Sequence, residues 1–140
     1  MVRAGASVLA GGDLVTATPL HWTRRIARRY NQSAELARAV AAEAGLRCDA
    51  DVIRRVKRTD SQDGKSRAKR ERNVAAAFKV PRAAADRVCE KRIVLIDDVL
   101  TTGATLTACA HALTAAGAAE VRILVFARVL AARRQTLTAL

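Results

Sequence analysis

Apolar residues fall into short β-branched runs separated by longer segments with helical spacing. Residues 14–18, 93–96 and 121–126 are such runs. Residues 93–96 are apolar at every position, which is typical of a parallel strand buried on both faces, and we expect the same burial for residues 121–126. Residues 32–44 and 104–116 repeat apolar side chains every three or four positions, as amphipathic helices do. Strands that alternate with helices predict an α/β fold with a mostly parallel sheet.

Residues with special backbone roles mark the ends of both helices. Asn31 is a suitable N-cap for the first helix, and Gly45 and Gly117 follow the two periodic segments, where glycine commonly ends a helix. The second helix and its flanking strands form a right-handed βαβ unit. We therefore expect one three-layer α/β sandwich over residues 1–140. Shorter predicted pieces are a helix within residues 2–10, strands at Val52–Ile53 and residues 78–80, and a helical tail over residues 128–140.

The segment from residue 56 to residue 77 breaks this pattern. It has no apolar periodicity, and residues 59–64 consist of turn-forming types. Nine Arg or Lys side chains and three acids lie within residues 54–72. Long segments of this kind inside compact domains are usually functional. We predict a mobile basic loop.

The net charge of the chain indicates what kind of molecule it binds. The formal net charge is +12, which favours an anionic partner, either the phosphates of a small ligand or a nucleic-acid backbone. The three cysteines lie far apart without a Cys-x-x-Cys pair, so the sequence supports neither a disulfide framework nor a zinc site. No apolar run approaches the ~20 residues of a membrane span. We expect a cytoplasmic protein.

Residues 93–105 carry the most specific chemistry. The apolar strand leads into Asp97 and Asp98, at the sheet edge where open α/β folds bind ligands. Residues 101–105 then turn into a helix whose first N–H groups lack intrahelical partners and attract a phosphate. Carboxylates accept hydrogen bonds from vicinal hydroxyls, so ribose 5-phosphate fits both halves of the pattern.

Two other folds place similar residues after a strand. A receiver domain has an acid pair after an early strand and a separate phosphorylated Asp. A dinucleotide-binding fold requires Gly-x-Gly-x-x-Gly, which is absent. The run Ile-Val-Leu-Ile-Asp-Asp-Val-Leu-Thr-Thr-Gly-Ala-Thr instead resembles the signature with which type I phosphoribosyltransferases bind 5-phosphoribosyl-1-pyrophosphate (PRPP).

Other segments resemble one branch, the competence-associated ComF family. They are Pro19–Trp22, Tyr30-Asn31-Gln32, the Gln-x-Gly-x-Ser-Arg-Ala-x-Arg-x-x-Asn run of residues 62–73, and Phe78. With the signature they span residues 15–127. The resemblance implies a type I phosphoribosyltransferase fold, here without the Cys-rich zinc-binding segment that usually precedes it.

The resemblance also assigns roles to individual residues. Asp97 and Asp98 would bind the ribose hydroxyls, and a pyrophosphate loop would follow the first strand. Lys65, Arg67 and Arg70 on the mobile loop would be the catalytic cations. Magnesium would be held mainly by oxygens of PRPP, without a dedicated protein site. The 5-phosphate would contact Thr101, Thr102, Gly103, Ala104 and Thr105, and the pyrophosphate would contact Pro19, Leu20, His21, Arg24 and Arg25.

Some positions depart from the family pattern, among them Ser61, Lys65 and Ala76. Thr101 stands where 6-oxopurine enzymes have a base-contacting Asp, so purine salvage is disfavoured. The first functional hypothesis is a phosphoribosyltransferase, an enzyme of pentosyl transfer in which an unidentified acceptor displaces pyrophosphate from PRPP with Mg²⁺. The alternative is a single-stranded-DNA-binding module for DNA uptake that retains a PRPP pocket. A homodimer is left open, and no membrane partner is expected.

Overall fold

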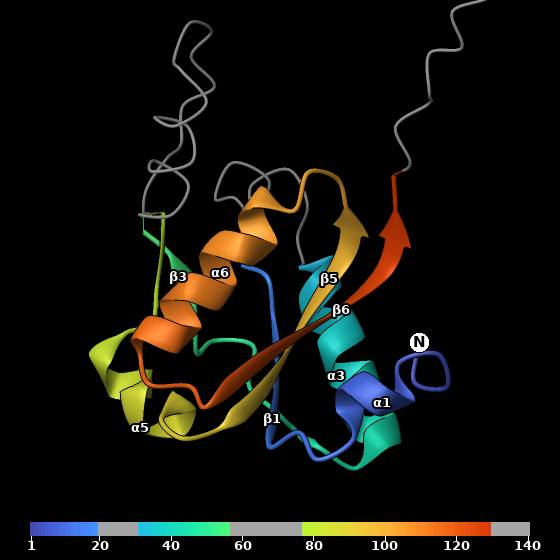
Figure 1. Ribbon diagram of the computed structural model, residues 1–140, viewed down its shortest axis with the longest axis horizontal. Coiled ribbons are helices and arrows are strands. Elements are labelled where there is room, and N and C mark those ends of the chain that lie inside the picture. Colours follow the sequence, from blue (N-terminus) through green and yellow to red (C-terminus); the bar gives the residue numbers. More distant parts are fainter. Residues whose placement is uncertain (20–30, 57–76, 130–140) are drawn as a thin grey trace, which may run out of the picture.

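A parallel sheet of four strands runs through the centre of the molecule (Figure 1). The computed structural model describes residues 1–19, 31–56 and 77–129. The strand order is β2-β1-β5-β6, and every neighbouring pair is parallel. The strands are β1 (Leu14–Ala17), β2 (Arg47–Cys48), β5 (Arg92–Leu100) and β6 (Glu120–Arg128).

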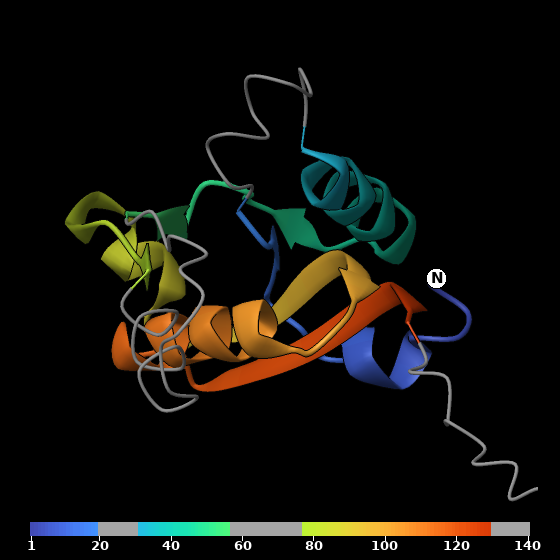
Figure 2. The ribbon, with the colours of Figure 1, turned by 90° about the horizontal axis from the view of Figure 1, so that it is seen from above.

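Helices cover both faces of the sheet (Figure 2). Helix α3 (Gln32–Ala44) and the short α1 (Ala6–Leu9) pack on one face, and α6 (Ala104–Ala115) packs on the other. The three-layer α/β architecture expected from the sequence is therefore confirmed. Gly45 and Gly117 both have positive φ just beyond their helices, as expected of glycines that end helices. None of the helices in the described ranges is long and apolar enough to cross a membrane.

Strand β5 connects the two hydrophobic cores. Ile93 and Leu95 face the core beneath α6, whereas Val94 and Ile96 face the core beneath α3, and all four side chains are fully buried. Because side chains alternate along a strand, a run with no polar residue fills both cores at once.

Several short elements differ from the sequence prediction. Val52 and Ile53 lie in a bend and are buried in the α6-side core, and the strand itself is β3 (Arg54–Arg55), antiparallel to β4 (Phe78–Lys79). The N-terminal helix is shorter than residues 2–10. Elements of two to four residues have no room for a periodic pattern. Those missed in this way are β2, the 3₁₀ turn η1 (Arg82–Ala84) and α5 (Ala85–Val88).

Residues 121–126 form a strand, as predicted, but the prediction that this strand is buried is wrong. Strand β6 is the outermost strand of the sheet, and no other strand in the described part of the chain pairs with its outer edge. Ile123 is 42% exposed and Phe126 is 66% exposed. Val99 and Val129 add to this exposed apolar edge. An apolar run alone does not distinguish an edge strand from a central one.

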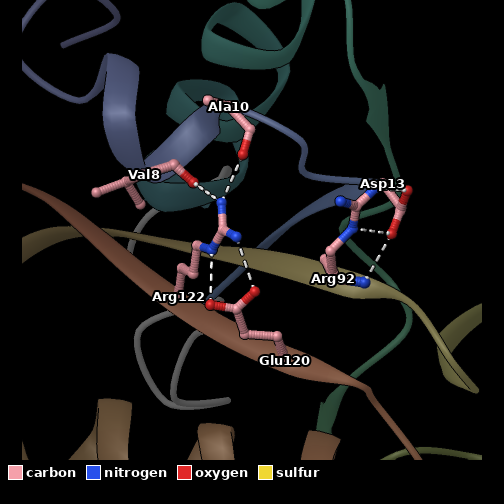
Figure 3. A network of polar contacts seen from close by, with 6 residues as sticks. All are labelled: Val8, Ala10, Asp13, Arg92, Glu120 and Arg122. Carbon is pink, nitrogen blue, oxygen red and sulfur yellow. Dashed lines mark hydrogen bonds and ion pairs between the residues drawn. The ribbon is translucent and has the colours of Figure 1, made fainter.

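Two arginines tie the N-terminal segment to the sheet (Figure 3). Arg122 donates to Val8 O at 3.2 Å and to Ala10 O at 2.6 Å, two carbonyls at the end of α1, while its other nitrogens bind Glu120. Arg92 binds both carboxylate oxygens of Asp13 at 3.0 Å. The bonds from Arg92 hold the pKa of Asp13 far below its ordinary value.

Acid should weaken the Asp13–Arg92 link. A carboxylate with a depressed folded-state pKa stabilises the fold above its unfolded pKa, near 4, and this stability is lost as the pH falls through the folded pKa. We expect Asp13→Asn to lower the urea midpoint at pH 7, and the difference from wild type to shrink below about pH 4. Asp86→Asn, at an exposed position on α5, is the matched control. A difference that stays constant from pH 7 to pH 3 would contradict this account.

Candidate functional site

Asp97 and Asp98 lie where β5 loses its neighbour on one side. Strand β1 ends at Ala17, opposite Ile96, whereas β5 continues to Leu100 alongside β6. The sequence predicted that the strand would end at the acid pair; instead the pair lies inside it. The half-buried carboxylates therefore stand beside the carboxyl end of β1, the edge where open α/β sheets bind ligands.

Hydrogen bonds fix one oxygen of each carboxylate. Asp97 Oδ1 accepts from the Ser33 hydroxyl at 3.0 Å and from the Asp98 N–H at 3.0 Å. Asp98 Oδ1 accepts from the Val99 N–H at 2.9 Å and lies 3.5 Å from Ser33 Oγ. Within the described residues, neither Oδ2 atom makes a hydrogen bond. The pair can therefore accept from a ligand without breaking its own contacts.

Burial has the largest effect on the pKa of Asp97. Burial raises the pKa of Asp97, and the neighbouring charge of Asp98 raises it further, whereas the bonds from Ser33 and from the Asp98 N–H act to lower it. Below the pair lies Cys109 on α6, a buried thiol whose pKa is raised to about 12 by burial and by the charge of Asp97. Cys109 therefore remains a neutral packing residue.

The turn after β5 forms a small polar hollow. Its volume is about 40 Å³, and it is lined by Asp97 and residues 99–106. Gly103 precedes α6 with φ +77°, a left-handed conformation that suits glycine. The first turn of α6 contains no acidic residue, and its dipole favours an anion; the Ala104 N–H donates to Thr102 Oγ1 at 3.4 Å. The five residues predicted to hold a 5-phosphate, Thr101 to Thr105, all line this hollow.

The buried polar side chains in the described part of the chain come from the two segments next to the acid pair. They are Thr16, Thr18 and Ser33, from the end of β1 and the start of α3. Thr18 binds Ile96 O through both its N–H, at 3.0 Å, and its hydroxyl, at 3.3 Å. Asn31 Nδ2 donates to Thr18 O at 3.2 Å. Buried polar groups are costly without partners, so their concentration here marks a site.

Some predicted site residues lie outside the described residues. Pro19 is half-buried and lies two residues after the end of β1. The others belong to residues 20–30, for the pyrophosphate loop, and residues 57–76, for the basic segment. The structure therefore brings the acid pair, the anion hollow and Pro19 to one sheet edge. The predicted residues that it does not describe are Leu20, His21, Arg24, Arg25, Lys65, Arg67 and Arg70.

The roles of two residues of this site were not predicted. Asn31 occupies the N-cap position of α3, as expected, but its side chain makes no cap bond and instead donates to Thr18 O. Ser33 was not singled out. It lies on the buried face of α3 with Ala34 and Ala37, so a polar residue on an apolar helix face was the available signal.

A metal ion at this site would depend on its ligand. No group of three or more His, Cys, Asp or Glu side chains in the described ranges could hold a metal ion. Magnesium commonly binds through substrate phosphates and water with few protein ligands. The hollow and the acid pair fit a magnesium carried by a phosphorylated sugar and do not fit a caged ion.

The chain matches the model of one protein family. The phosphoribosyl transferase domain covers residues 31–138. The chain is 36% identical over 119 residues to DNA utilization protein YhgH of Salmonella typhi, covering 84% of this chain and 50% of that protein. It is 29% identical over 116 residues to Competence protein F of Haemophilus influenzae, covering 83% and 50%. The chain thus spans about half the length of these curated relatives.

Solved structures with the same fold include several enzymes. The allosteric regulatory enzyme of purine biosynthesis superimposes with a TM-score of 0.57 at 25% identity, covering 87% of this chain and 23% of that one. Hypoxanthine phosphoribosyltransferase of Staphylococcus aureus gives 0.54 at 14% identity, covering 91% and 70%. At such identities the likeness concerns the fold.

Two glycines with similar backbones allow a matched test of the hollow. Gly103→Ala and Gly45→Ala each force a residue with a Cβ into positive φ, without a close clash, and should each destabilise the fold by about 1 kcal/mol. Only Gly103→Ala should weaken the binding of orthophosphate, measured by amide shifts in an NMR titration. Equal phosphate binding by the two variants would contradict the assignment of the anion site.

Proposed function

Because the chain belongs to the phosphoribosyl transferase domain family, we propose that it binds PRPP with Mg²⁺ and that an acceptor displaces pyrophosphate from the sugar. Within that family it is ComF-like, as its sequence motifs indicate and as its similarity to Competence protein F supports. The acceptor's nucleophilic atom would bond to C1 of the ribose, and the C1–O bond to pyrophosphate would break, its electron pair leaving with the pyrophosphate.

One observation carries the proposal: the acid pair and the anion hollow occupy one strand–turn–helix unit. Asp97 lines the hollow together with Thr101 to Thr105, and it also belongs to the acid pair. A ligand that reaches both must combine hydroxyls with a phosphate a few bonds away. PRPP has this chemistry at its ribose and 5-phosphate.

The remaining charge of PRPP is on its pyrophosphate. Pro19 lies two residues after the end of β1, and Thr18 between them is bonded to Ile96 O, the carbonyl before Asp97, so the segment after Pro19, with His21, Arg24 and Arg25, is suited to the leaving group. Bound Mg²⁺ would neutralise part of the diphosphate charge. Lys65, Arg67 and Arg70 are proposed to complete this neutralisation and to exclude water.

The names of two relatives and the charge of this chain favour a second candidate. DNA utilization protein YhgH and Competence protein F are named for DNA-related roles. A formal charge of +12 also suits a polyanion. Under this alternative the basic residues 54–72 bind single-stranded DNA, and the PRPP pocket is regulatory or vestigial.

The acid pair provides the direct test of PRPP binding. We expect Asp97→Asn with Asp98→Asn to weaken binding of Mg–PRPP by at least about a hundredfold, because two charge-assisted hydrogen bonds are lost. Calorimetry measures the effect, and Asp51→Asn with Asp86→Asn makes the same change in net charge at exposed positions. If the site variant retains wild-type affinity, the pocket has been assigned wrongly.

The basic segment separates the enzyme from the DNA module. In an enzyme, replacing Lys65, Arg67 and Arg70 with Ala should lower the rate of pyrophosphate release more than it lowers PRPP affinity, because the cations act on the transition state. In a DNA module the same change should flatten the log–log salt dependence of single-stranded DNA binding by up to about 2, at roughly 0.7 for each lost phosphate contact. A variant unchanged in both assays would rule out both roles for these residues.

A further inference from the structure

Ser33 touches both members of the acid pair from a different layer of the fold. The residue is 5% exposed, and its hydroxyl lies 3.0 Å from Asp97 Oδ1 and 3.5 Å from Asp98 Oδ1. A serine hydroxyl carries one proton, so it donates mainly to the nearer carboxylate. A buried hydroxyl that donates to a carboxylate favours its charged form.

The position of Ser33 in α3 adds to this effect. It is the second residue of a 13-residue helix whose N-cap side chain makes no bond to the N–H groups of the helix. The first N–H groups of such a helix lack intrahelical partners and carry partial positive charge. The acid pair contacted by Ser33 therefore lies near the positive end of a helix, which offsets the repulsion between two adjacent carboxylates.

The start of α3 is also hydrogen-bonded to the end of β1, the strand that precedes the residues predicted to bind pyrophosphate. Asn31 holds Thr18 O, and Thr18 is bonded twice to Ile96 O, the carbonyl directly before Asp97. The start of α3, the end of β1 and the acid pair are thus connected by hydrogen bonds. A shift of Ser33 would therefore disturb both the Asp97 carboxylate and the hydrogen bonds at the end of β1.

Ser33 leaves the outer carboxylate oxygens available to a ligand. It shares Asp97 Oδ1 with the Asp98 N–H, so both of these donors contact the same oxygen. A carboxylate held at one oxygen has a fixed orientation and presents the other oxygen at a defined place.

We propose that Ser33 is a positioning residue of the PRPP site, which holds the Asp97 carboxylate oriented and ionised so that its free oxygen accepts a ribose hydroxyl. This inference rests on the proposed function for the identity of the ligand. It differs from that proposal because the hydrogen bond from Ser33 to Asp97 exists without a ligand, and its effect can be measured in the free protein.

The charged and titratable groups near Asp97 define the pH test. Asp98 is its neighbour on β5, Cys109 faces it from α6 as a neutral thiol, and Arg55 on β3 acts on Cys109. Neither the thiol nor the guanidinium titrates between pH 3 and 8. Removing the Ser33 hydroxyl withdraws an interaction that lowers the pKa of Asp97, so Asp97 should protonate at higher pH.

The first arm is ¹³C NMR titration of the Asp97 carboxyl carbon in the free protein. Ser33→Ala should raise the Asp97 pKa by about one unit, and Ser33→Thr, which keeps the hydroxyl, should restore it. Thr114→Ala, an exposed hydroxyl removal on α6, should change nothing. If Ser33→Ala does not fold, Ser33→Cys retains the volume with a weaker donor and should shift the pKa in the same direction. An unchanged Asp97 pKa would overturn the inference.

The second arm measures Mg–PRPP affinity by calorimetry from pH 4.5 to 7.5. Ser33→Ala should shift the pH at which affinity is half lost upward by the same one unit or so, giving a roughly tenfold weaker complex on the acid side. A uniform loss at all pH values together with an unchanged Asp97 pKa would mean a merely structural role and would overturn the inference. A wild-type protein that binds no PRPP at any pH would refute the proposed function instead, while the NMR arm still reports on the hold of Ser33 on Asp97.

Discussion

Strand β5 has to bury side chains on both of its faces and still carry two half-buried carboxylates near its carboxyl end. Its apolar half satisfies the first demand, because alternate residues fill the α3-side and α6-side cores. The carboxylates can face a ligand because β1 ends opposite Ile96, one residue before Asp97, and does not pair with β5 beyond that point. The packing that fixes the strand thereby also fixes the acids, and the site inherits the rigidity of the core.

Nearly all the chemistry of the site comes from the three segments next to this opening. The start of α3 supplies Ser33 and Asn31, the end of β1 supplies Thr18, and the turn before α6 supplies the anion hollow. The start of α3 and the end of β1 are joined by the hydrogen bond from Asn31 to Thr18, and Asp97, which accepts from Ser33, also lines the hollow. A ligand that spans them would meet groups whose positions are already set, which lowers the entropic cost of binding.

How far the sequence predicted this arrangement depended on the length of each feature. The helices α3 and α6 and the strand β5 were found because an apolar period persists over many residues. The acid pair and the turn to Thr105 were found because a continuous motif carries them. Ser33 was missed because its role comes from a contact with a residue 64 positions away; the local pattern marks it only as a polar residue on an apolar helix face and does not name its partner. The exposure of β6 was missed because an apolar run does not reveal how many neighbours its strand has.

The exposed edge of β6 has a consequence for the behaviour of the protein in solution. A strand edge to which no strand of the described residues is paired, with Ile123 and Phe126 exposed, is a template for adding another strand. The formal charge of +12 opposes this, because two copies repel each other before their edges meet. Salt shortens the range of that repulsion, from about 10 Å at 0.1 M to about 3 Å at 1 M. The protein should therefore resist aggregation better at low than at high ionic strength. A protein kept in solution by a fully polar surface should show the opposite dependence.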